Sequence, residues 1–235
     1  MTTGLDDPRI LAGMRRQFDL FEERRRSGAR RIGWKVGFGA PAAKEKLKID
    51  NPLIGFLLDE AVLGDGATVS LAGWTKPVAE PEIAIEIGRD VPAAASELET
   101  AQCIASIGPA IELADIDGPM DDVESILAGD IFQRHVIFGP RTSTRLPDGL
   151  AGLTGDVIRN GQSVPMPEDL ESNTGSLLDT VRGVAGTLAM FNERLRAGDL
   201  VIAGSVTPPL FLGADDRLVS WELRPIGRIV VSFTS

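Results

Sequence analysis

Hydrophobic and polar residues alternate along two stretches near the middle of the chain, and this alternation predicts two strands that each bury one face. In the stretch 78–88, V-A-E-P-E-I-A-I-E-I-G, isoleucines occupy every second position, while Glu80 and Glu82 share the opposite face. In the stretch 107–116, I-G-P-A-I-E-L-A-D-I, Glu112 lies between two alanines on one face. Two such strands can bring three carboxylates around one small space.

These three carboxylates indicate a metal site. Without a partner, their charges would repel one another and resist burial, and a divalent cation removes both penalties. Carboxylate oxygens are hard ligands, so the expected ion is Mg²⁺ or Mn²⁺ rather than Ca²⁺. Three protein ligands on an octahedral ion leave about three positions for water or substrate, which is what a catalytic site requires.

An alternative interpretation is that the glutamates only keep the strands solvated, as in many acidic proteins. Glu112 argues against it, because this residue interrupts an otherwise apolar strand. Glu86, which comes shortly before Gly88 at the end of the first stretch, is expected to be solvated in this way.

The rest of the pattern predicts short strands that outnumber the helices. Asp7 and Pro8 are typical of a helix start, so a helix is expected at about 7–27. Further strands are expected at 33–38, 199–205, 217–223 and 227–233, a hairpin at 156–164, and helices at 41–48, 96–106 and 175–196. We therefore expect an α+β fold, a mixed, largely antiparallel β-roll or distorted barrel with peripheral helices, in one domain over residues 1–235.

Composition narrows the class of protein. The chain has 235 residues, of which 43% are hydrophobic, which allows one sizeable core in an ordinary soluble protein. A formal net charge of −10 argues against general affinity for nucleic acid or anionic membranes. No apolar run approaches the roughly 18 residues of a membrane-spanning helix. The single cysteine, Cys103, forbids an internal disulfide and fits a reducing cytoplasm.

Several segments together resemble the fumarylacetoacetate hydrolase superfamily. The segments that carry the likeness are V-A-E-P-E-I-A at 78–84, P-A-I-E-L-A-D at 109–115, G-W-K-V-G-F at 33–38, G-F-L-L-D at 55–59 and L-R-A-G-D-L-V-I-A-G-S at 195–205. The chain most resembles the 2-keto-4-pentenoate hydratase branch, which includes 2-hydroxypenta-2,4-dienoate hydratases and oxalocrotonate decarboxylases. That branch holds Mg²⁺ or Mn²⁺ on a Glu-x-Glu pair and a third glutamate, which implies Glu80, Glu82 and Glu112 as ligands.

The resemblance also implies roles for basic and acidic residues outside the glutamates. The lysine of the family that matches Lys35 faces the active site, where it could hold a substrate carboxylate or move a proton. The alternative is a lysine whose amine reaches the surface. Asp59 is expected to orient Lys35 or a water, or else to be an ordinary aspartate at a strand end. Lys76 is expected, from its position just before the first glutamate strand rather than from the resemblance, to be a second cation that contacts substrate.

Hydroxyl residues near the last predicted site segment complete the candidate site. Ser205 and Thr207 follow Gly204, and such residues can bind a carboxylate through Oγ and backbone N–H groups. The alternative is a plain Gly-Ser turn. His135 is the only histidine, and we expect a structural role for it. Superfamily members that hydrolyse carbon–carbon bonds use a histidine in a differently placed loop, and this chain lacks that motif.

The function that the resemblance implies is a metal-dependent lyase, a hydratase that adds water to a 2-hydroxy-2,4-dienoate or 2-oxo-4-enoate. The ion would act as a Lewis acid and stabilise the enolate. Decarboxylation of a 2-oxo-3-enedioate or carbon–carbon hydrolysis at the same site is the alternative, and a catalytically silent partner subunit is another. The resemblance further implies a cytoplasmic homo-oligomer that can associate with a paralogous decarboxylase.

Overall fold

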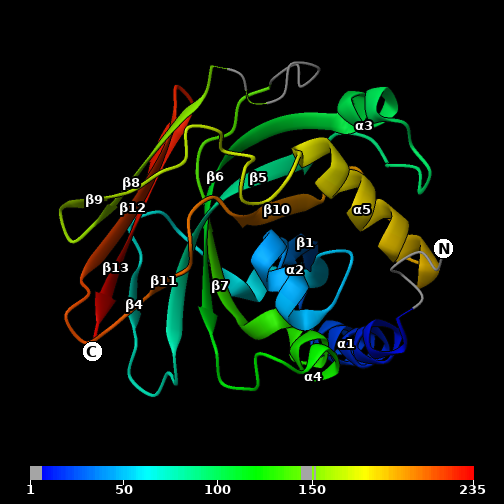
Figure 1. Cartoon of the computed structure of the whole chain (residues 1–235), viewed down its shortest axis with the longest axis horizontal. Helices are drawn as coiled ribbons and strands as arrows, with labels where there is room; N and C mark the ends of the chain where they lie inside the picture. Colours follow the sequence, from blue (N-terminus) through cyan, green and yellow to red (C-terminus); the bar gives the residue numbers. More distant parts are fainter. Residues whose placement is uncertain (1–6, 144–149, 151) are drawn as a thin grey trace.

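The computed structural model describes residues 7–143, 150 and 152–235, and its strands form two sheets (Figure 1). The larger sheet contains β1 (Arg31–Gly37), β2 (Leu53–Leu58), β3 (Val62–Leu63), β5 (Pro77–Ile87), β6 (Ile104–Asp115), β7 (Gln133–Phe138), β10 (Leu200–Ser205) and β11 (Leu210–Phe211). Their order across the sheet is β2-β1-β10-β5-β6-β7-β3, and β11 pairs with the start of β5.

The smaller sheet is ordered β4-β13-β12-β8-β9. Its strands are β4 (Thr68–Ser70), β8 (Thr154–Arg159), β9 (Gln162–Val164), β12 (Leu218–Arg224) and β13 (Gly227–Thr234). Most neighbouring strands in both sheets are antiparallel, and the parallel pairs are β1 with β10, β3 with β7, and β4 with β13. The predicted mixed, largely antiparallel architecture is confirmed, with β5 and β6 as long curved strands through its middle (Figure 1).

Helices lie around the sheets, as the sequence predicted. In the described residues they are α1 (Pro8–Arg26), α2 (Pro41–Leu47), α3 (Glu97–Cys103), α4 (Val123–Ala128) and α5 (Leu177–Met190), with 3-10 turns η2 (Asp59–Ala61) and η3 (Asp130–Phe132). Figure 1 shows α1, α2 and α4 gathered on one side of the larger sheet, while α3 and α5 lie together elsewhere. None of these helices is long and apolar enough to cross a membrane.

Helix α1 confirms the prediction for residues 7–27. Asp7 caps the helix, because its side-chain oxygen accepts a hydrogen bond from the backbone nitrogen of Arg9 at 2.9 Å. The buried face of α1 contains Met14 and Phe21, which lie within the apolar clusters that α1 shares with α4 and β2. The helix therefore covers the outer edge of the larger sheet.

Helix α3 is shorter than expected. Ser96 and Glu99 form the predicted capping box, but the helix ends at Cys103 rather than near the end of the predicted range 96–106. Strand β6 begins directly at Ile104, because residues from this point onward pair with β5. The strand that carries the third glutamate is thus longer than its alternating pattern indicated.

Helix α5 also ends early. The sequence predicted a helix over 175–196, whereas α5 stops at Met190. Asn192 has a positive φ of 58°, a left-handed conformation that terminates the helix. Leu195 then forms an isolated bridge with Val91, so this part of the chain pairs with the segment that follows β5.

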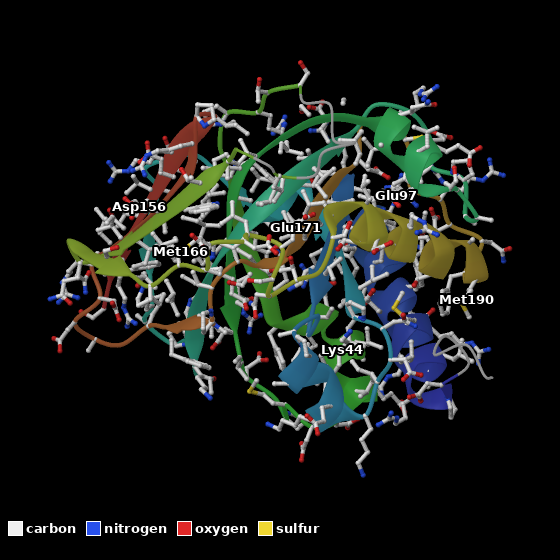
Figure 2. All side chains as sticks on the ribbon, turned by 45° about the horizontal axis from the view of Figure 1, so that its top comes forward. Lys44, Glu97, Asp156, Met166, Glu171 and Met190 are labelled. Atoms are coloured by element: carbon white, nitrogen blue, oxygen red, sulfur yellow. The ribbon has the colours of Figure 1, made fainter. Side chains whose placement is uncertain are left out.

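The core joins the two sheets. Trp221 of β12 is fully buried in the largest apolar cluster, together with Ile83 and Ile85 of β5. Its indole nitrogen donates a hydrogen bond to the backbone oxygen of Glu82 at 2.7 Å. Side chains fill the space between sheets and helices throughout (Figure 2). The smaller sheet consequently holds β5 in place from behind.

Candidate metal centre

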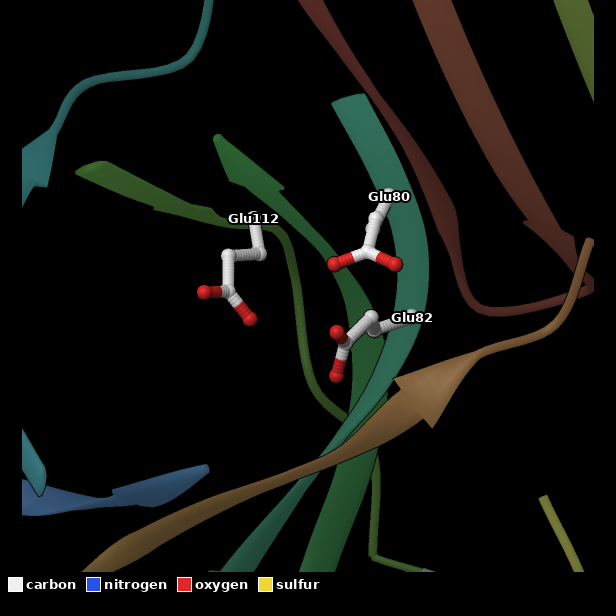
Figure 3. A group of neighbouring side chains, drawn as sticks. All are labelled: Glu80, Glu82 and Glu112. Atoms are coloured by element: carbon white, nitrogen blue, oxygen red, sulfur yellow. The ribbon is translucent and has the colours of Figure 1, made fainter. Parts of the chain in front are cut away.

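The pairing of β5 with β6 brings the three predicted glutamates together. Glu80 and Glu112 are direct cross-strand partners, and Glu82 is the next residue of β5 on the same face. Each offers a carboxylate oxygen, and these oxygens lie within 4.8 Å of one another. Figure 3 shows the three side chains pointing into one shared space. Glu82 and Glu112 are each only 1% exposed.

The electrostatics of this cluster suit a cation. Burial and the repulsion of Glu112 raise the pKa of Glu80 to about 7, although the charge of Lys35 acts in the opposite direction. Burial, Glu112 and Glu80 raise the pKa of Glu82 well above its ordinary value. The raised pKa values of Glu80 and Glu82 show that these acids are costly to ionise beside Glu112, and a hard divalent cation supplies the missing charge. The donor set therefore fits the Mg²⁺ or Mn²⁺ that the sequence predicted.

Lys35 of β1 lies beside the cluster and is buried, so its amine does not reach the surface. Its Nζ donates hydrogen bonds to Glu112 and, at 3.0 Å, to the backbone oxygen of Ile131. Burial alone would lower the pKa of Lys35, but the neighbouring Glu112 and Asp130 carboxylates raise it above the ordinary value. A charged ammonium therefore faces the same cavity as the glutamates.

Asp59 does not lie near Lys35, contrary to the role expected for it. Strands β1 and β2 are antiparallel, so Lys35 pairs with Gly55 in mid-strand while the end of β2 lies beside Arg31. Asp59 follows that end and accepts hydrogen bonds from the backbone nitrogen and Nε of Arg30, each at 2.8 Å. The residue is separated from Lys35 by about four strand positions, roughly 13 Å. The structure thus places Asp59 as a strand-end residue outside the cavity.

Asp130 is the acid that lies near Lys35, and the sequence analysis missed it. Its buried carboxylate accepts a hydrogen bond from the backbone nitrogen of Phe56 at 2.8 Å. Burial raises the pKa of Asp130 to about 8, although the charge of Lys35 acts in the opposite direction. Asp130 and Ile131 have positive φ values of 55° and 51°, and this left-handed turn presents both the carboxylate and the Ile131 oxygen to Lys35.

A bulge in β10 supplies another wall of the cavity. Its register against β5 shifts between Ile202 and Ser205, and Gly204 in between adopts a positive φ of 93°. The backbone nitrogen of Gly204 donates a hydrogen bond to Glu82 Oε2 at 2.8 Å, which holds one expected ligand in position. This contact was also missed, because a bulge leaves no clear sequence pattern.

Ser205 and Thr207 both line the cavity. Thr207 Oγ1 donates a hydrogen bond to the backbone oxygen of Pro208 at 3.0 Å, whereas Ser205 Oγ makes only a long contact of 3.4 Å with the oxygen of Pro81. Asn173, which the sequence analysis did not single out, donates to the backbone oxygen of Ser205 at 2.7 Å and braces the turn. Ser205 therefore has the more available hydroxyl.

The other predicted residues lie farther out. Lys76 is exposed, and its ammonium is 4.5 Å from the centre of the Phe211 ring, which lines the cavity. His135 pairs with Leu113, on the face of β6 opposite Glu112, and its ring packs against Trp74 with centroids 6.1 Å apart. The only histidine of the chain is thus outside the cavity, in agreement with a structural role.

The cavity in front of the glutamates has a volume of about 210 Å³. Strands β1, β5, β6 and β10, the start of α2 and the left-handed turn η3 contribute its walls. Its lining combines the three glutamates and Lys35 with a few uncharged polar residues and many apolar side chains. The arrangement can hold one metal ion together with a small acidic substrate.

Comparison with known proteins places this site in a family. The family described as fumarylacetoacetate (FAA) hydrolase, C-terminal, matches residues 31–233. The chain belongs to this family. The match includes both glutamate strands, Lys35 and the β10 bulge, so the FAA hydrolase resemblance inferred from the sequence is confirmed.

Relatives within this FAA hydrolase family include enzymes of the expected branch. A 2-hydroxyhexa-2,4-dienoate hydratase from Comamonas testosteroni is 28% identical over 90% of this chain and 81% of its own length. A 2-keto-4-pentenoate hydratase from Paraburkholderia xenovorans is 26% identical over 88% of this chain and 78% of its own. A 4-oxalocrotonate decarboxylase from a Pseudomonas species is 24% identical over 92% and 83%.

Solved structures of the same fold carry divalent ions. The 4-oxalocrotonate decarboxylase from Pseudomonas putida G7, complexed with magnesium and adipate, superimposes with a TM-score of 0.83 and 21% identity, over 92% of this chain and 83% of that one. A fumarylpyruvate hydrolase from Pseudomonas aeruginosa, in complex with Mn²⁺ and pyruvate, gives a TM-score of 0.69 at 15% identity, over 87% and 89%. These likenesses confirm the fold predicted from the sequence.

Proposed function

We propose that this protein is a divalent-metal-dependent hydratase, a lyase that adds water to a 2-hydroxy-2,4-dienoate or the corresponding 2-oxo-4-enoate. The observation that carries the proposal is the cluster of Glu80, Glu82 and Glu112 beside a buried, charged Lys35 in one cavity. The hydratases among the sequence relatives support the same reaction class.

Glu80, Glu82 and Glu112 would hold Mg²⁺ or Mn²⁺, which when bound supplies Lewis-acid polarisation of the 2-oxo group. Side chains of the protein bind and orient the substrate. Ser205 contacts the substrate carboxylate through its available hydroxyl, and Thr207 does so less directly because its hydroxyl already donates to Pro208. Buried strands around the cavity exclude bulk water, which strengthens each of these polar interactions.

We assign proton transfer to Lys35. Its ammonium is held by Glu112 and by the Ile131 oxygen, and it faces the cavity where the substrate carbons would lie. Asp130 lies close enough to raise the pKa of this amine, so we assign to it the positioning role first given to Asp59. Lys76, at the rim beside Phe211, would meet substrate on entry rather than during the reaction.

The alternatives differ in how well the cavity accommodates them. Decarboxylation of a 2-oxo-3-enedioate uses the same glutamates and lysine, and the 24% identical decarboxylase keeps it as the second candidate. Hydrolysis of a carbon–carbon bond by a histidine is disfavoured, because His135 lies on the opposite face of the sheet from Glu112. A silent partner subunit is disfavoured, since it has no need for three mutually repelling buried carboxylates.

The family resemblance also supports a homo-oligomer, and association with a paralogous decarboxylase is part of this proposal. The single, buried Cys103 agrees with a reducing cytoplasm. Size measurements on the purified protein, alone and mixed with such a decarboxylase, test both associations. If the protein is strictly monomeric and does not bind the decarboxylase, both proposed associations are wrong, whereas the reaction assignment is unaffected.

The experiment that tests the reaction is calorimetric titration of metal-free protein with Mn²⁺, followed by oxalate, a chelating mimic of the substrate head. We expect oxalate to bind only when Mn²⁺ is present, and a freshly prepared 2-hydroxy-2,4-dienoate to lose its ultraviolet absorbance. Glu112→Gln should abolish Mn²⁺ binding. The matched control is Glu86→Gln on β5, the strand of Glu80 and Glu82, because its carboxylate accepts hydrogen bonds from Ser106 and Arg141 outside the cluster. Metal-independent oxalate binding would contradict the proposal.

A further inference from the structure

Gln17 of α1 is a buried amide that joins two other elements of the fold. Its side-chain Nε2 donates hydrogen bonds to the backbone oxygens of Ile54 at 3.1 Å and of Leu127 at 2.9 Å. Ile54 belongs to β2, and Leu127 belongs to the last turn of α4. One amide group of α1 therefore holds the end of α4 against the edge of the larger sheet.

The bond to Ile54 lies next to the contact that holds Asp130. Strand β2 is the last strand on its side of the larger sheet, so one row of its backbone groups has no neighbouring strand. Along this edge the Ile54 oxygen accepts from Gln17 and, two residues later, the Phe56 nitrogen donates to Asp130 Oδ1. Gln17 and Asp130 thus bind adjacent backbone groups of β2.

The bond to Leu127 supports the start of a turn whose far end contacts Lys35. Three residues after Leu127, the consecutive residues Asp130, Ile131 and Phe132 have positive φ values of 55°, 51° and 62°. Left-handed conformations are unfavourable for such residues and persist only where surrounding contacts hold them. The Ile131 oxygen in this turn accepts a hydrogen bond from Lys35 Nζ at 3.0 Å. A contact that fixes Leu127 therefore helps to fix the surroundings of the lysine.

A glycine lets α1 lie close enough to α4 for this contact. Gly13 lies one turn before Gln17 on the same buried face of α1. A Cβ atom at Gly13 would lie 2.7 Å from Leu127 Cβ and 2.9 Å from the Glu124 backbone oxygen. Glycine weakens a helix interior relative to alanine, and here the short distance between the two helices explains its presence.

The chemistry of Gln17 argues against a role in packing alone. Its Oε1 is buried without a hydrogen-bond partner among the described residues. An unpaired buried acceptor is unfavourable, and a methionine of similar size would fill the same space without that cost. The two hydrogen bonds that the amide donates therefore explain why a glutamine occupies this position.

We propose that Gln17 is a positioning residue for proton transfer, because it sets α4 and the η3 turn against β2 so that Asp130 and the Ile131 oxygen face Lys35. This inference rests on the proposed function, in which Lys35 moves the proton. Gln17 does not line the cavity, and its two acceptors lie outside the cavity lining as well. Its loss should therefore affect the proton step rather than the binding of metal or substrate.

Gln17→Met tests the proposal, because it removes both hydrogen bonds and keeps the length of the side chain. On the Mn²⁺-loaded protein, we expect kcat for a 2-hydroxy-2,4-dienoate to fall at least about tenfold. KM and the calorimetric dissociation constant of oxalate should each change less than about twofold. An unchanged kcat, or a loss that lies entirely in KM, would contradict the proposal.

The matched control is Ile10→Val, which removes one methyl group from the same buried face of α1 and leaves Gln17 intact. This variant should lower the melting temperature while kcat stays at the wild-type value. If both variants instead lower kcat in proportion to their loss of melting temperature, Gln17 contributes to stability alone and the proposal is wrong.

Gly13→Ala tests the same arrangement without changing the amide. The added methyl group should push α1 away from Leu127 and lower kcat severalfold, with KM unchanged. Because both substitutions act through one contact, the double variant should lose little more activity than Gln17→Met alone. Fully multiplicative losses of kcat would contradict a shared contact.

The outcomes also separate this inference from the proposed function. If the Mn²⁺-loaded wild type neither binds oxalate nor consumes the dienol, the proposed function is wrong and this inference is wrong with it. If the wild type is active and Gln17→Met has the same kcat, only the positioning role of Gln17 is wrong.

Discussion

Lys35 and Gly55 face each other across β1 and β2, and the missing side chain at Gly55 leaves the space that Lys35 and Asp130 occupy. A Cβ atom at Gly55 would lie 2.6 Å from Asp130 Oδ1 and 2.9 Å from Lys35 Cγ. Both distances are too short for unbonded atoms. The glycine of the G-F-L-L-D segment is therefore needed for packing around the lysine, which the sequence pattern alone did not reveal.

Gly55→Ala should displace the lysine that we assign to proton transfer. We expect overpacking to cost about 1–3 kcal/mol of unfolding free energy and to lower turnover of the dienol at least about tenfold, with smaller change in Mn²⁺ affinity. Denaturant unfolding and steady-state kinetics measure the two effects. The matched control is Gly183→Ala on the exposed face of α5, where an added Cβ meets nothing within 4 Å and should stabilise the helix slightly.

Asp130→Asn tests the buried acid beside Lys35. The pKa of Asp130 is raised to about 8, so the folded protein binds more protons than the unfolded chain between about pH 4 and 8. Stability of the metal-free wild type should therefore fall as pH rises through that window. The variant keeps a neutral acceptor for the Phe56 nitrogen and should show a shallower fall, gaining at least about 1 kcal/mol over wild type at pH 9. Identical pH profiles of unfolding free energy would contradict this account.

Glu82 and Glu112 should respond differently to loss of charge. Without metal, Glu82→Gln should stabilise the protein, because it removes a buried charge that repels Glu80 and Glu112. Glu112→Gln should destabilise it by about 3–5 kcal/mol, because it leaves the Lys35 ammonium buried without its ion-pair partner.

Added metal should stabilise the wild type more than either variant. Mn²⁺ at a hundred times its dissociation constant should stabilise wild type by about 2.7 kcal/mol, and neither variant should respond fully. Thermal unfolding of wild type and both variants, with and without Mn²⁺, measures the contrast. If neither Mn²⁺ nor Mg²⁺ changes the melting temperature of the wild type, the site is not a metal centre.

How much of this site was predictable depends on the range of the interactions involved. Alternation along a strand is local, so the shared face of Glu80 and Glu82 was evident, and an apolar stretch interrupted by Glu112 indicated the third member. Asp59 was wrongly expected beside Lys35, because the antiparallel register of β1 and β2, which pairs Lys35 with Gly55, could not be read from the sequence. Neighbours across a sheet follow from register, which the chain order alone does not determine.

Other parts of the site depend on backbone conformations that no sequence pattern predicts. Asp130 lies beside Lys35 only because consecutive non-glycine residues adopt left-handed φ values, which are uncommon and sustained by the surrounding packing. Gly204 reaches Glu82 only because β10 bulges opposite Ile83. The fold class was predictable, since many short alternating segments admit few arrangements, whereas these two contacts required the structure.

Trp221→Phe tests whether the smaller sheet positions the metal ligands. The substitution keeps an aromatic ring in the core but removes the hydrogen bond from Nε1 to the Glu82 backbone oxygen. We expect a loss of about 1–3 kcal/mol in unfolding free energy and, in addition, weaker Mn²⁺ binding, because Glu82 is then held only by β10 and β6. Trp74→Phe, on a residue that packs against His135 away from the cavity, is the control and should leave the Mn²⁺ affinity unchanged. If Trp221→Phe lowers stability without changing the Mn²⁺ affinity, the indole contributes to the core alone and the glutamates are positioned entirely by the larger sheet.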